Sequence, residues 1–580
     1  MQRLIRRRDV TGSAAALERS GLHPLLARVY AGRGVEDAAE LNLELGSLLP
    51  PATLSGTAEA AQLLAQALAK GERILIVGDF DADGATSTAL AVTVLRACGA
   101  AHVDYLVPNR FDFGYGLSPE IVDIGLQDKP QLIITVDNGI SSLSGVRRAA
   151  DAGVRTLITD HHLPGRDLPE ATVIVNPCLP GCHFASKNLA GVGVIFYVML
   201  ALRAELRRRN WFAERGLPEP NLGEVLDLVA LGTVADVVPL DRNNRILIDA
   251  GLRRIRAGRA RPGIQALLEI SGRRAERLVA ADLGFAVGPR LNAAGRLEDM
   301  SVGIACLLSE DAAIAAGLAG QLHELNLERR QIEQGMQREA LSLLADLELR
   351  EPDDEQPLSY VLYRPGWHQG VVGLLASRIK DRMHRPTIAF ADAGGGLLKG
   401  SARSIPGLHI RDILDAVATR HAGLVGKFGG HAMAAGLSLE ASRLDEFRQA
   451  LEAEVTLHAG DVRLQAELES DGELEPAEFD MALAETLRLA GPWGQHFPEP
   501  LFDGVFELIT QRIVGEKHLK MLLRLPDGGL DIDAIAFNID TGLWPNPGID
   551  RVRIVYRLDV NEFRGQRSLQ LLVEDLQLSS

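Results

Sequence analysis

The stretch ILIVGDFDADGATSTA, around residue 80, most constrains what this chain can fold into. Its apolar run, Ile74 to Val77, is typical of a buried strand and leads to Asp79, Asp81 and Asp83 at alternate positions. Alternate residues of an extended strand point to one face, so the pattern predicts three neighbouring carboxylates. Such groups repel one another unless cations or hydrogen-bond donors neutralise them, although an acidic turn in solvent is the alternative. We therefore favour a divalent-cation site at the end of a strand.

Two later stretches repeat this pattern of an apolar run followed by metal-competent side chains. LIITVDNG ends in Asp137 before an Asn-Gly turn, and TLITDHH ends in Asp160, His161 and His162. In an open parallel sheet the carboxyl ends of the strands line one crevice, so residues about 80 positions apart can meet there. These motifs are predicted to share one site.

A further carboxylate, Asp236, is the only charged residue within the apolar stretch LVALGTVADVVPL. A carboxylate in such surroundings needs a partner. A helix N-cap contact or a buried hydrogen bond would satisfy it, but beside the other motifs we interpret it as a metal ligand. Carboxylate ligands in excess over imidazole favour Mn²⁺ or Mg²⁺ over zinc.

The order of predicted elements gives an α/β fold. Predicted strands alternate with helices, as in a parallel sheet, near residues 74–78, 103–107, 132–136, 155–159 and 172–175. A charged stretch without proline predicts a connector helix, a second α/β unit follows, and five short strand patterns after residue 460 predict either an OB-fold or a plain structural barrel. The predicted domains are the first α/β domain with an N-terminal extension (1–310), the connector (311–349), the second α/β domain (350–457) and the OB-fold-like module (458–580).

Composition restricts the classes of protein that fit. A net charge of −16 over 580 residues argues against a general nucleic-acid coat. Eight arginines between residues 253 and 277, against two glutamates, would grip a polyanion locally or form a solvated helix face. We find neither a leader nor a run of 18 apolar residues, so we expect a soluble, cytoplasmic protein without membrane contact.

Cys178 and Cys182 are predicted to be structural thiols, with a zinc site as the alternative.

Several glycine-containing stretches carry side chains that suit phosphates or nucleobases. In VPNRFDFGYG, Arg110 suits phosphate and Tyr115 suits base stacking, although a packed aromatic loop also fits. KGSARS offers Ser401 and Arg403 for a terminal-phosphate pocket, and His431 in GGHAMAAG is catalytic, substrate-orienting or structural. A further predicted loop, GPRLNAAGRLEDM, carries Arg290, Asn292 and Arg296.

Together these stretches resemble the DHH phosphoesterase superfamily, and within it the RecJ type most closely. The matching stretches, in the family's order, are DFDADG, VDNG, TDHH, LGTVADVVPL, GPRLNAAGRL, GWHQGVVGLLASRI, KGSARS and GGHAMAAG. The resemblance implies a 5′ to 3′ exonuclease for single-stranded DNA, acting in DNA repair and recombination. The alternatives are a phosphoesterase for short oligonucleotides or cyclic dinucleotides, and an inactive DNA-binding scaffold, which would have lost metal ligands.

The resemblance also implies roles for the residues named above. Two ions, Mn²⁺ or Mg²⁺, are expected, with Asp137 bridging them, Asp79 and Asp81 completing one site, and Asp83, His161 and Asp236 completing the other. Asp160 is expected to orient a histidine and His162 to touch the scissile phosphate. In the RecJ type the stretch with Arg290, Asn292 and Arg296 lines the substrate path. Expected partners are single-stranded DNA, single-strand-binding protein and a recombination helicase, for a protein that is itself a monomer.

Overall fold

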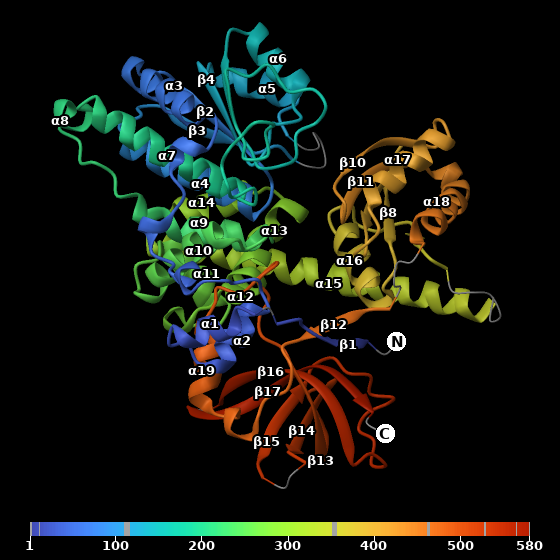
Figure 1. Ribbon diagram of the computed structural model, residues 1–580. Helices are drawn as coiled ribbons and strands as arrows, with labels where there is room; N and C mark the ends of the chain where they lie inside the picture. Colours follow the sequence, from blue (N-terminus) through green and yellow to red (C-terminus); the bar gives the residue numbers. More distant parts are fainter. Residues whose placement is uncertain are drawn as a thin grey trace. The chain divides into compact units, whose positions relative to one another are not determined.

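The computed structural model describes residues 3–10, 12–109, 116–350, 357–460, 465–526, 529–563 and 565–578. The chain divides into two compact units, drawn in Figure 1. One unit contains Ile5–His323 with Glu469–Ser580, and the other contains Met1–Leu4 with Glu324–Leu468. Each unit is described by itself.

A five-stranded parallel sheet organises the first unit, which confirms the predicted α/β fold. The strand order is β3-β2-β4-β5-β6, and the strands are β2 (Ile74–Gly78), β3 (Val103–Leu106), β4 (Leu132–Val136), β5 (Arg155–Thr159) and β6 (Val173–Val175). The chain leaves β2 toward one edge and returns to β4 on its other side, which makes a topological switch point between β2 and β4. Ligand sites of open α/β sheets lie at the carboxyl ends of the strands beside such a point.

Helices from successive crossovers cover both faces of this sheet (Figure 1). On one face, α5 (Pro119–Gly125) and α6 (Leu143–Asp151) bury an apolar core with side chains such as Leu75 and Ile158. On the other, α4 (Ala82–Ala97) and α7 (Gly191–Arg208) pack against β2, β4 and each other. The rest of this region is helical: α1 (Ala14–Arg19), α2 (Pro24–Ala31), α3 (Thr57–Lys70), α8 (Trp211–Arg215), α9 (Leu226–Ala235), α10 (Arg242–Arg256), α11 (Pro262–Ile270), α12 (Ala280–Asp282), α13 (Gly288–Leu297) and α14 (Ser301–Leu308).

Helix α13 corrects one prediction, because GPRLNAAGRLEDM was expected to be a loop. The proline follows Gly288 in the first turn, where a helix tolerates it. Gly295 does not break the helix. A Cβ atom at this position would overlap the carbonyl oxygen of Phe80, so the glycine permits a close approach between α13 and the loop after β2.

The C-terminal strands form a closed barrel, as predicted, in the order β13-β14-β15-β17-β16. They are β13 (Phe502–Val514), β14 (His518–Arg524), β15 (Asp531–Ala536), β16 (Arg551–Phe563) and β17 (Gln566–Leu578), preceded by α19 (Met481–Leu489). The N-terminal helices contact the segment that leads into this barrel. Arg33 donates to Asp471 over 2.8 Å, with both side chains buried, and the Tyr30 hydroxyl donates to the carbonyl of Ala490 over 2.7 Å.

The second unit contains a mixed five-stranded sheet in the order β10-β11-β9-β8-β7. Its strands are β7 (Tyr360–Tyr363), β8 (Thr387–Gly394), β9 (Leu397–Arg403), β10 (Val425–Gly430) and β11 (Ala434–Glu440), and its helices are α16 (Val372–Met383), α17 (Ile410–Arg420) and α18 (Leu444–Ala459). The predicted connector is the long helix α15 (Ala312–Arg350), and the division between the units falls within it. The short strands β1 (Leu4–Arg7) and β12 (Glu467–Ser470) pair with each other.

Among the helices described, α15 included, none combines the length and the apolar character needed to cross a bilayer.

Candidate metal centre

The three aspartates after β2 reach the site from a loop and a helix start. The strand ends at Gly78, Asp79 follows it, and Asp81 is the N-cap of α4. One oxygen of Asp81 accepts the backbone N–H groups of Asp83 and Gly84, both over 3.0 Å. The prediction that alternation along a strand groups these carboxylates was therefore wrong. An N-cap and the first helical turn bring them together.

Asp83 is buried against the start of α7. Its two oxygens accept the N–H groups of Gly191 and Val192 over 2.6 and 2.9 Å. The positive end of a helix and two amide donors stabilise its negative charge. Burial, followed by the charges of Asp236 and Asp81, nevertheless raises the pKa of Asp83 well above its usual range.

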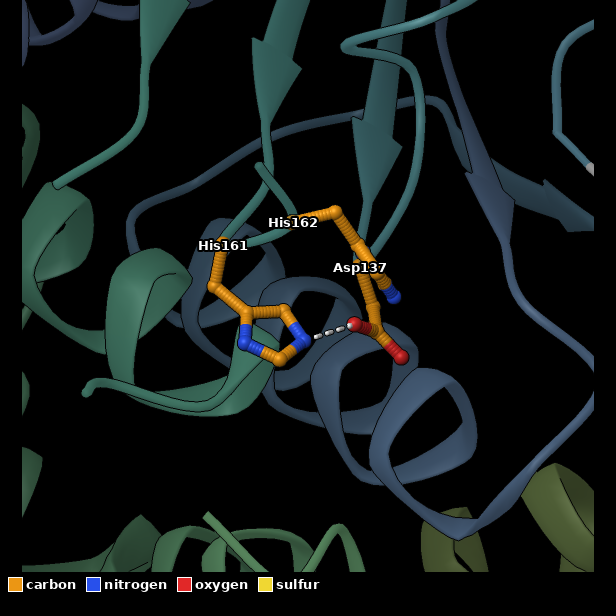
Figure 2. Close-up of side chains that lie close together, drawn as sticks. All are labelled: Asp137, His161 and His162. Atoms are coloured by element: carbon orange, nitrogen blue, oxygen red, sulfur yellow. Dashed lines mark ion pairs between the residues drawn. The ribbon is translucent and has the colours of Figure 1, made fainter. Parts of the chain in front are cut away.

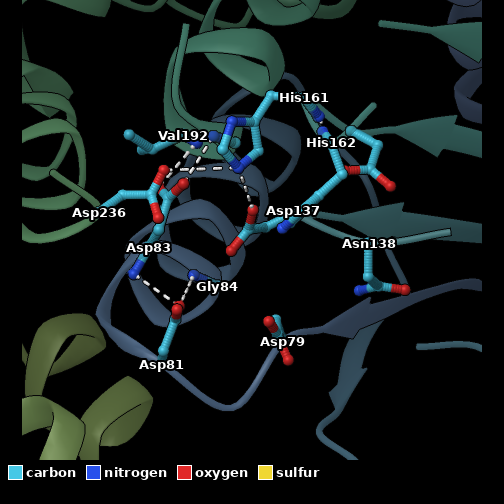
Figure 3. Close-up of polar contacts among 12 residues, drawn as sticks. Asp79, Asp81, Asp83, Gly84, Asp137, Asn138, His161, His162, Val192 and Asp236 are labelled. Carbon is cyan, nitrogen blue, oxygen red and sulfur yellow. Dashed lines mark hydrogen bonds and ion pairs between the residues drawn. The ribbon is translucent and has the colours of Figure 1, made fainter. Parts of the chain in front are cut away.

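Asp137 follows β4 and lies at the centre of the acidic group. It is buried and has a left-handed backbone, with φ of 62°. Figure 2 shows His161 turned toward it, with Nε2 of His161 3.2 Å from Oδ1 of Asp137. The same nitrogen lies 3.4 Å from Oδ2 of Asp236, which closes the group on its other side (Figure 3). Asp236 is the C-cap of α9, so the alternative prediction that it is a helix N-cap was wrong.

Asp160 holds the loop that carries both histidines. Its carboxylate accepts the backbone N–H groups of Ile140, His161 and His162 over 2.8, 2.7 and 3.1 Å. Nδ1 of His162 lies 2.8 Å from the same carboxylate, so His162 is the histidine that Asp160 orients. Burial alone would lower the pKa of His162, but the Asp160 hydrogen bond and charge raise it to about 9.

The donor set fits hard divalent cations. Ligand atoms lie within 4.8 Å of one another in each of three groups: Asp79, Asp81 and Asp137; Asp83, His161 and Asp236; and Asp137, His161 and His162. Burial, followed by the charge of Asp83, raises the pKa of Asp137 well above its usual range. Burial also raises the pKa of Asp236, against the effect of His161. These carboxylates therefore require positive charge to be ionised together, and a donor set richer in carboxylate than in imidazole suits Mn²⁺ or Mg²⁺.

Three contributors to this site escaped the sequence reading. The amides of Gly191 and Val192 were missed, although the small residues of LAGVGV are a usable sign of close packing. Asn138 donates to the carbonyls of Val77 and Val136 over 3.0 and 2.9 Å, tying the ends of β2 and β4 together. Backbone amides and a neutral carboxamide leave no charge pattern in a sequence.

The predicted DNA-binding residues occupy several elements. Arg110 and Tyr115 lie outside the described residues. Arg290, Asn292 and Arg296 lie on α13, and Nε of Arg290 is 3.2 Å from a ring nitrogen of a histidine in the N-terminal part of α15. The roles of all five stay predictions.

Ser401, Arg403 and His431 belong to the second unit. Arg403 donates to the hydroxyl of Ser401 over 2.8 Å on β9. A Cβ atom at Gly373, in the first turn of α16, would be 3.0 Å from both side chains, so a cation, a hydroxyl and a helix N-terminus converge here. His431 follows β10, and its backbone N–H donates to the carbonyl of Ala434 over 2.7 Å.

The arginine-rich segment is largely engaged within the protein. Arg261 pairs with Asp227 over 3.4 Å and Arg273 with Asp282 over 3.3 Å. Two more of its arginines, at positions 274 and 277, pair with Glu562 of the barrel. The segment thus contributes internal ion pairs, including a contact to the barrel, and fits a continuous basic track poorly.

The two cysteines singled out by their spacing are free thiols. Cys178 is half-buried, and its sulfur donates to the carbonyl of Lys187 over 3.5 Å. Cys182 is buried. In the described part of the chain, the groups of metal-competent side chains do not include them.

Comparisons with known proteins cover nearly the whole chain. Residues 73–233 match the DHH family, N-terminal domain, residues 357–457 the DHHA1 domain and residues 470–575 the RecJ OB domain. The chain is 57% identical to the single-stranded-DNA-specific exonuclease RecJ of Escherichia coli K12, over 99% of this chain and 98% of that protein. The crystal structure of RecJ from Thermus thermophilus in complex with Mn²⁺ matches all of this chain and 80% of that one, with a TM-score of 0.81 at 31% identity. The Mg²⁺ complex from the same organism matches with a TM-score of 0.75 at 29% identity, over 100% and 79% of the two chains.

Proposed function

This chain belongs to the RecJ family, and from that membership we propose that it is a single-stranded-DNA-specific exonuclease acting in DNA repair and recombination. The proposal rests above all on the buried carboxylate and imidazole group at the switch point of the sheet. The match extends through all three family domains, so the chain contains the full set of domains of such an enzyme and not only the catalytic one.

The reaction we propose is hydrolysis of a phosphodiester bond with two cations, Mn²⁺ or Mg²⁺. Asp79, Asp81 and Asp137 would hold one ion, and Asp83, His161 and Asp236 would complete the other site with Asp137 shared. When bound, such ions activate a water molecule and stabilise the charge of the displaced oxygen. The burial of Asp79, Asp83 and Asp137 supports the assignment, because ionised groups in such surroundings need compensation.

The protein's own side chains would align the phosphate. Asp160 fixes the ring of His162 through Nδ1, and its hydrogen bond and charge raise the pKa of that ring in the metal-free protein. A protonated imidazole carries a second N–H group, at Nε2. We assign it to a nonbridging oxygen of the scissile phosphate, where it would bind and orient without entering the metal sites.

We propose that the other predicted residues bind the strand. Arg110, Tyr115, Arg290 and Arg296 would contact it from the predicted 1–310 domain. Ser401 and Arg403 would hold a terminal phosphate, supported by their convergence with the start of α16, and His431 would orient the substrate beside them. The barrel would grip the strand at a distance from the metals.

We further propose the domain division 1–310, 311–349, 350–457 and 458–580. The protein would act as a monomer in the cytoplasm, with single-strand-binding protein and a recombination helicase as partners. Its polarity would be 5′ to 3′.

A timed digestion of end-labelled single strands tests the proposal. A 5′ label should appear at once in mononucleotides, whereas a 3′ label should stay on a strand that shortens progressively. Duplex of the same sequence serves as the control and should resist. Release of the 3′ label first would refute the polarity, and equal kcat/KM for a dinucleotide and a long strand would favour the short-oligonucleotide phosphoesterase.

A further inference from the structure

Helix α13 contacts the aspartate loop at two points, one on either side of Asp81. Oδ1 of Asn292 accepts the N–H of Ala82 over 2.8 Å. Gly295 lies three residues further along the same helix face, where a Cβ atom would overlap the carbonyl oxygen of Phe80. One face of one helix therefore holds the main chain both before and after a predicted metal ligand.

Asn292 binds a backbone N–H group at the start of α4 that the N-cap residue leaves without a partner. The first N–H groups of a helix have no partner within the helix. The side chain of Asp81 satisfies two of them, those of Asp83 and Gly84, and the carbonyl of Asp81 accepts the first regular helical bond, from Ala85. The N–H of Ala82 is the next of this set, and it is the one that Asn292 accepts.

We propose that Asn292 is a positioning residue of the cation site, an inference that rests on the proposed two-cation function. By fixing the first turn of α4, it holds the carboxylates of Asp81 and Asp83 at the spacing the ions require. Its predicted role as a DNA contact would use the opposite end of the carboxamide, because a phosphate accepts hydrogen bonds and only the Nδ2 hydrogens can donate. The two roles therefore predict different behaviour for variants that keep the oxygen.

The test compares two substitutions at one position, with readouts that do not depend on nuclease activity. Asn292→Ala removes the acceptor, and Asn292→Asp keeps an acceptor oxygen but loses both amide hydrogens. Mn²⁺ affinity is measured by calorimetry without DNA, and single-stranded DNA affinity is measured in EDTA. Asn221→Ala is the matched control, because Asn221 also caps a helix, accepts from Gly223 over 3.1 Å, and is exposed.

We expect Asn292→Ala to weaken Mn²⁺ binding about tenfold, the usual scale for a residue that orients metal ligands. Its DNA affinity in EDTA should stay within about twofold of wild type. Asn292→Asp should bind Mn²⁺ within about threefold of wild type or more tightly, and the Asn221 variant should change neither quantity.

Three results would overturn the inference: unchanged Mn²⁺ binding by Asn292→Ala, equally weak binding by both Asn292 variants, or loss of DNA affinity in EDTA by both. Should Asn292→Ala fail to fold, Asn292→Asp decides alone, since a DNA contact predicts weaker DNA binding in EDTA and a positioning role predicts unchanged DNA binding together with near-normal Mn²⁺ binding. A wild-type protein that binds no Mn²⁺ would instead refute the two-cation function, and with it this inference.

Discussion

Replacing Asp137 by asparagine should abolish nuclease activity and make the metal-free protein more stable. Asparagine has the same shape, and it tolerates the left-handed backbone at φ of 62° better than most residues do. The fit matters here, because a Cβ atom at Gly191 would be only 2.6 Å from Cβ of Asp137. The substitution therefore removes a buried charge while leaving the packing in place.

The size of the stabilisation follows from the spacing of the carboxylates. Ligand atoms of Asp137, Asp79 and Asp81 lie within 4.8 Å of one another. Two like charges at this distance repel by about 3 kcal/mol at an effective dielectric constant near 20. Because burial and Asp83 raise the pKa of Asp137, partial protonation already relieves some repulsion in the wild type. We therefore expect a gain of about 1 to 3 kcal/mol in unfolding free energy in EDTA.

The assay is thermal unfolding of both proteins in EDTA and in Mn²⁺, with turnover measured on single-stranded DNA. In EDTA the variant should melt about 1 to 3 °C above wild type. The carboxyl pKa is raised in the folded state, so wild type loses stability as pH rises through that pKa, and the gain should be larger at pH 8 than at pH 5. Mn²⁺ should stabilise wild type much more than the variant. A variant that is less stable in EDTA, or normal turnover at saturating Mn²⁺, would refute the reasoning.

Three further changes test other parts of the molecule. Arg403→Ala should raise KM far more than it lowers kcat, by about 1.5 to 3 kcal/mol of lost phosphate contact, and a pure kcat defect would exclude the binding role. The double substitution Lys520→Ala with Phe537→Ala removes a partly exposed lysine of β14, which pairs with Asp533 over 3.4 Å, and the exposed ring that follows β15. It should weaken binding of long strands and reduce its salt dependence by about one unit of slope, with dinucleotide hydrolysis unchanged. Equal losses on both substrates would contradict the gripping role. Asp503→Asn should destabilise the protein at neutral pH. Burial raises the pKa of Asp503, but hydrogen bonds from Arg7, a serine and a second arginine hold that pKa below its usual value. The stability that the Asp503 carboxylate contributes is therefore lost as the pH falls through the lowered pKa. A difference in unfolding free energy between wild type and Asp503→Asn that does not shrink as the pH falls would contradict this prediction.

The parts of the site that the sequence predicted share one physical signature. An apolar strand that ends in a charged side chain is rare enough to stand out, and this located Asp79, Asp137, Asp160 and His161. The topology of the sheet could then be expected to bring them together, since parallel strands end at one edge. The closed barrel was equally accessible, because five strand patterns were separated by turns.

The parts that escaped prediction depend on contacts between distant segments. Glycine and asparagine in GPRLNAAGRLEDM suggested a loop, but Gly295 serves a close approach to Phe80, some 200 residues earlier, and leaves the helix intact. The arginine-rich segment suggested a track for DNA, whereas several of its charges are paired, two of them with Glu562. The sequence of a segment gives the number of its charges, but it does not show which of them form ion pairs with distant segments.

The buried ion pair between Arg33 and Asp471 has a consequence for the order in which the protein is made. Its two residues are 438 positions apart, and Tyr30 likewise waits for a carbonyl near residue 490. A ribosome adds about 5 to 20 residues per second, so the N-terminal helices emerge roughly 20 to 90 seconds before their partners exist. During that interval a guanidinium that ends up with no solvent exposure must remain hydrated. These early helices are thus among the last parts of the chain to reach their final packing.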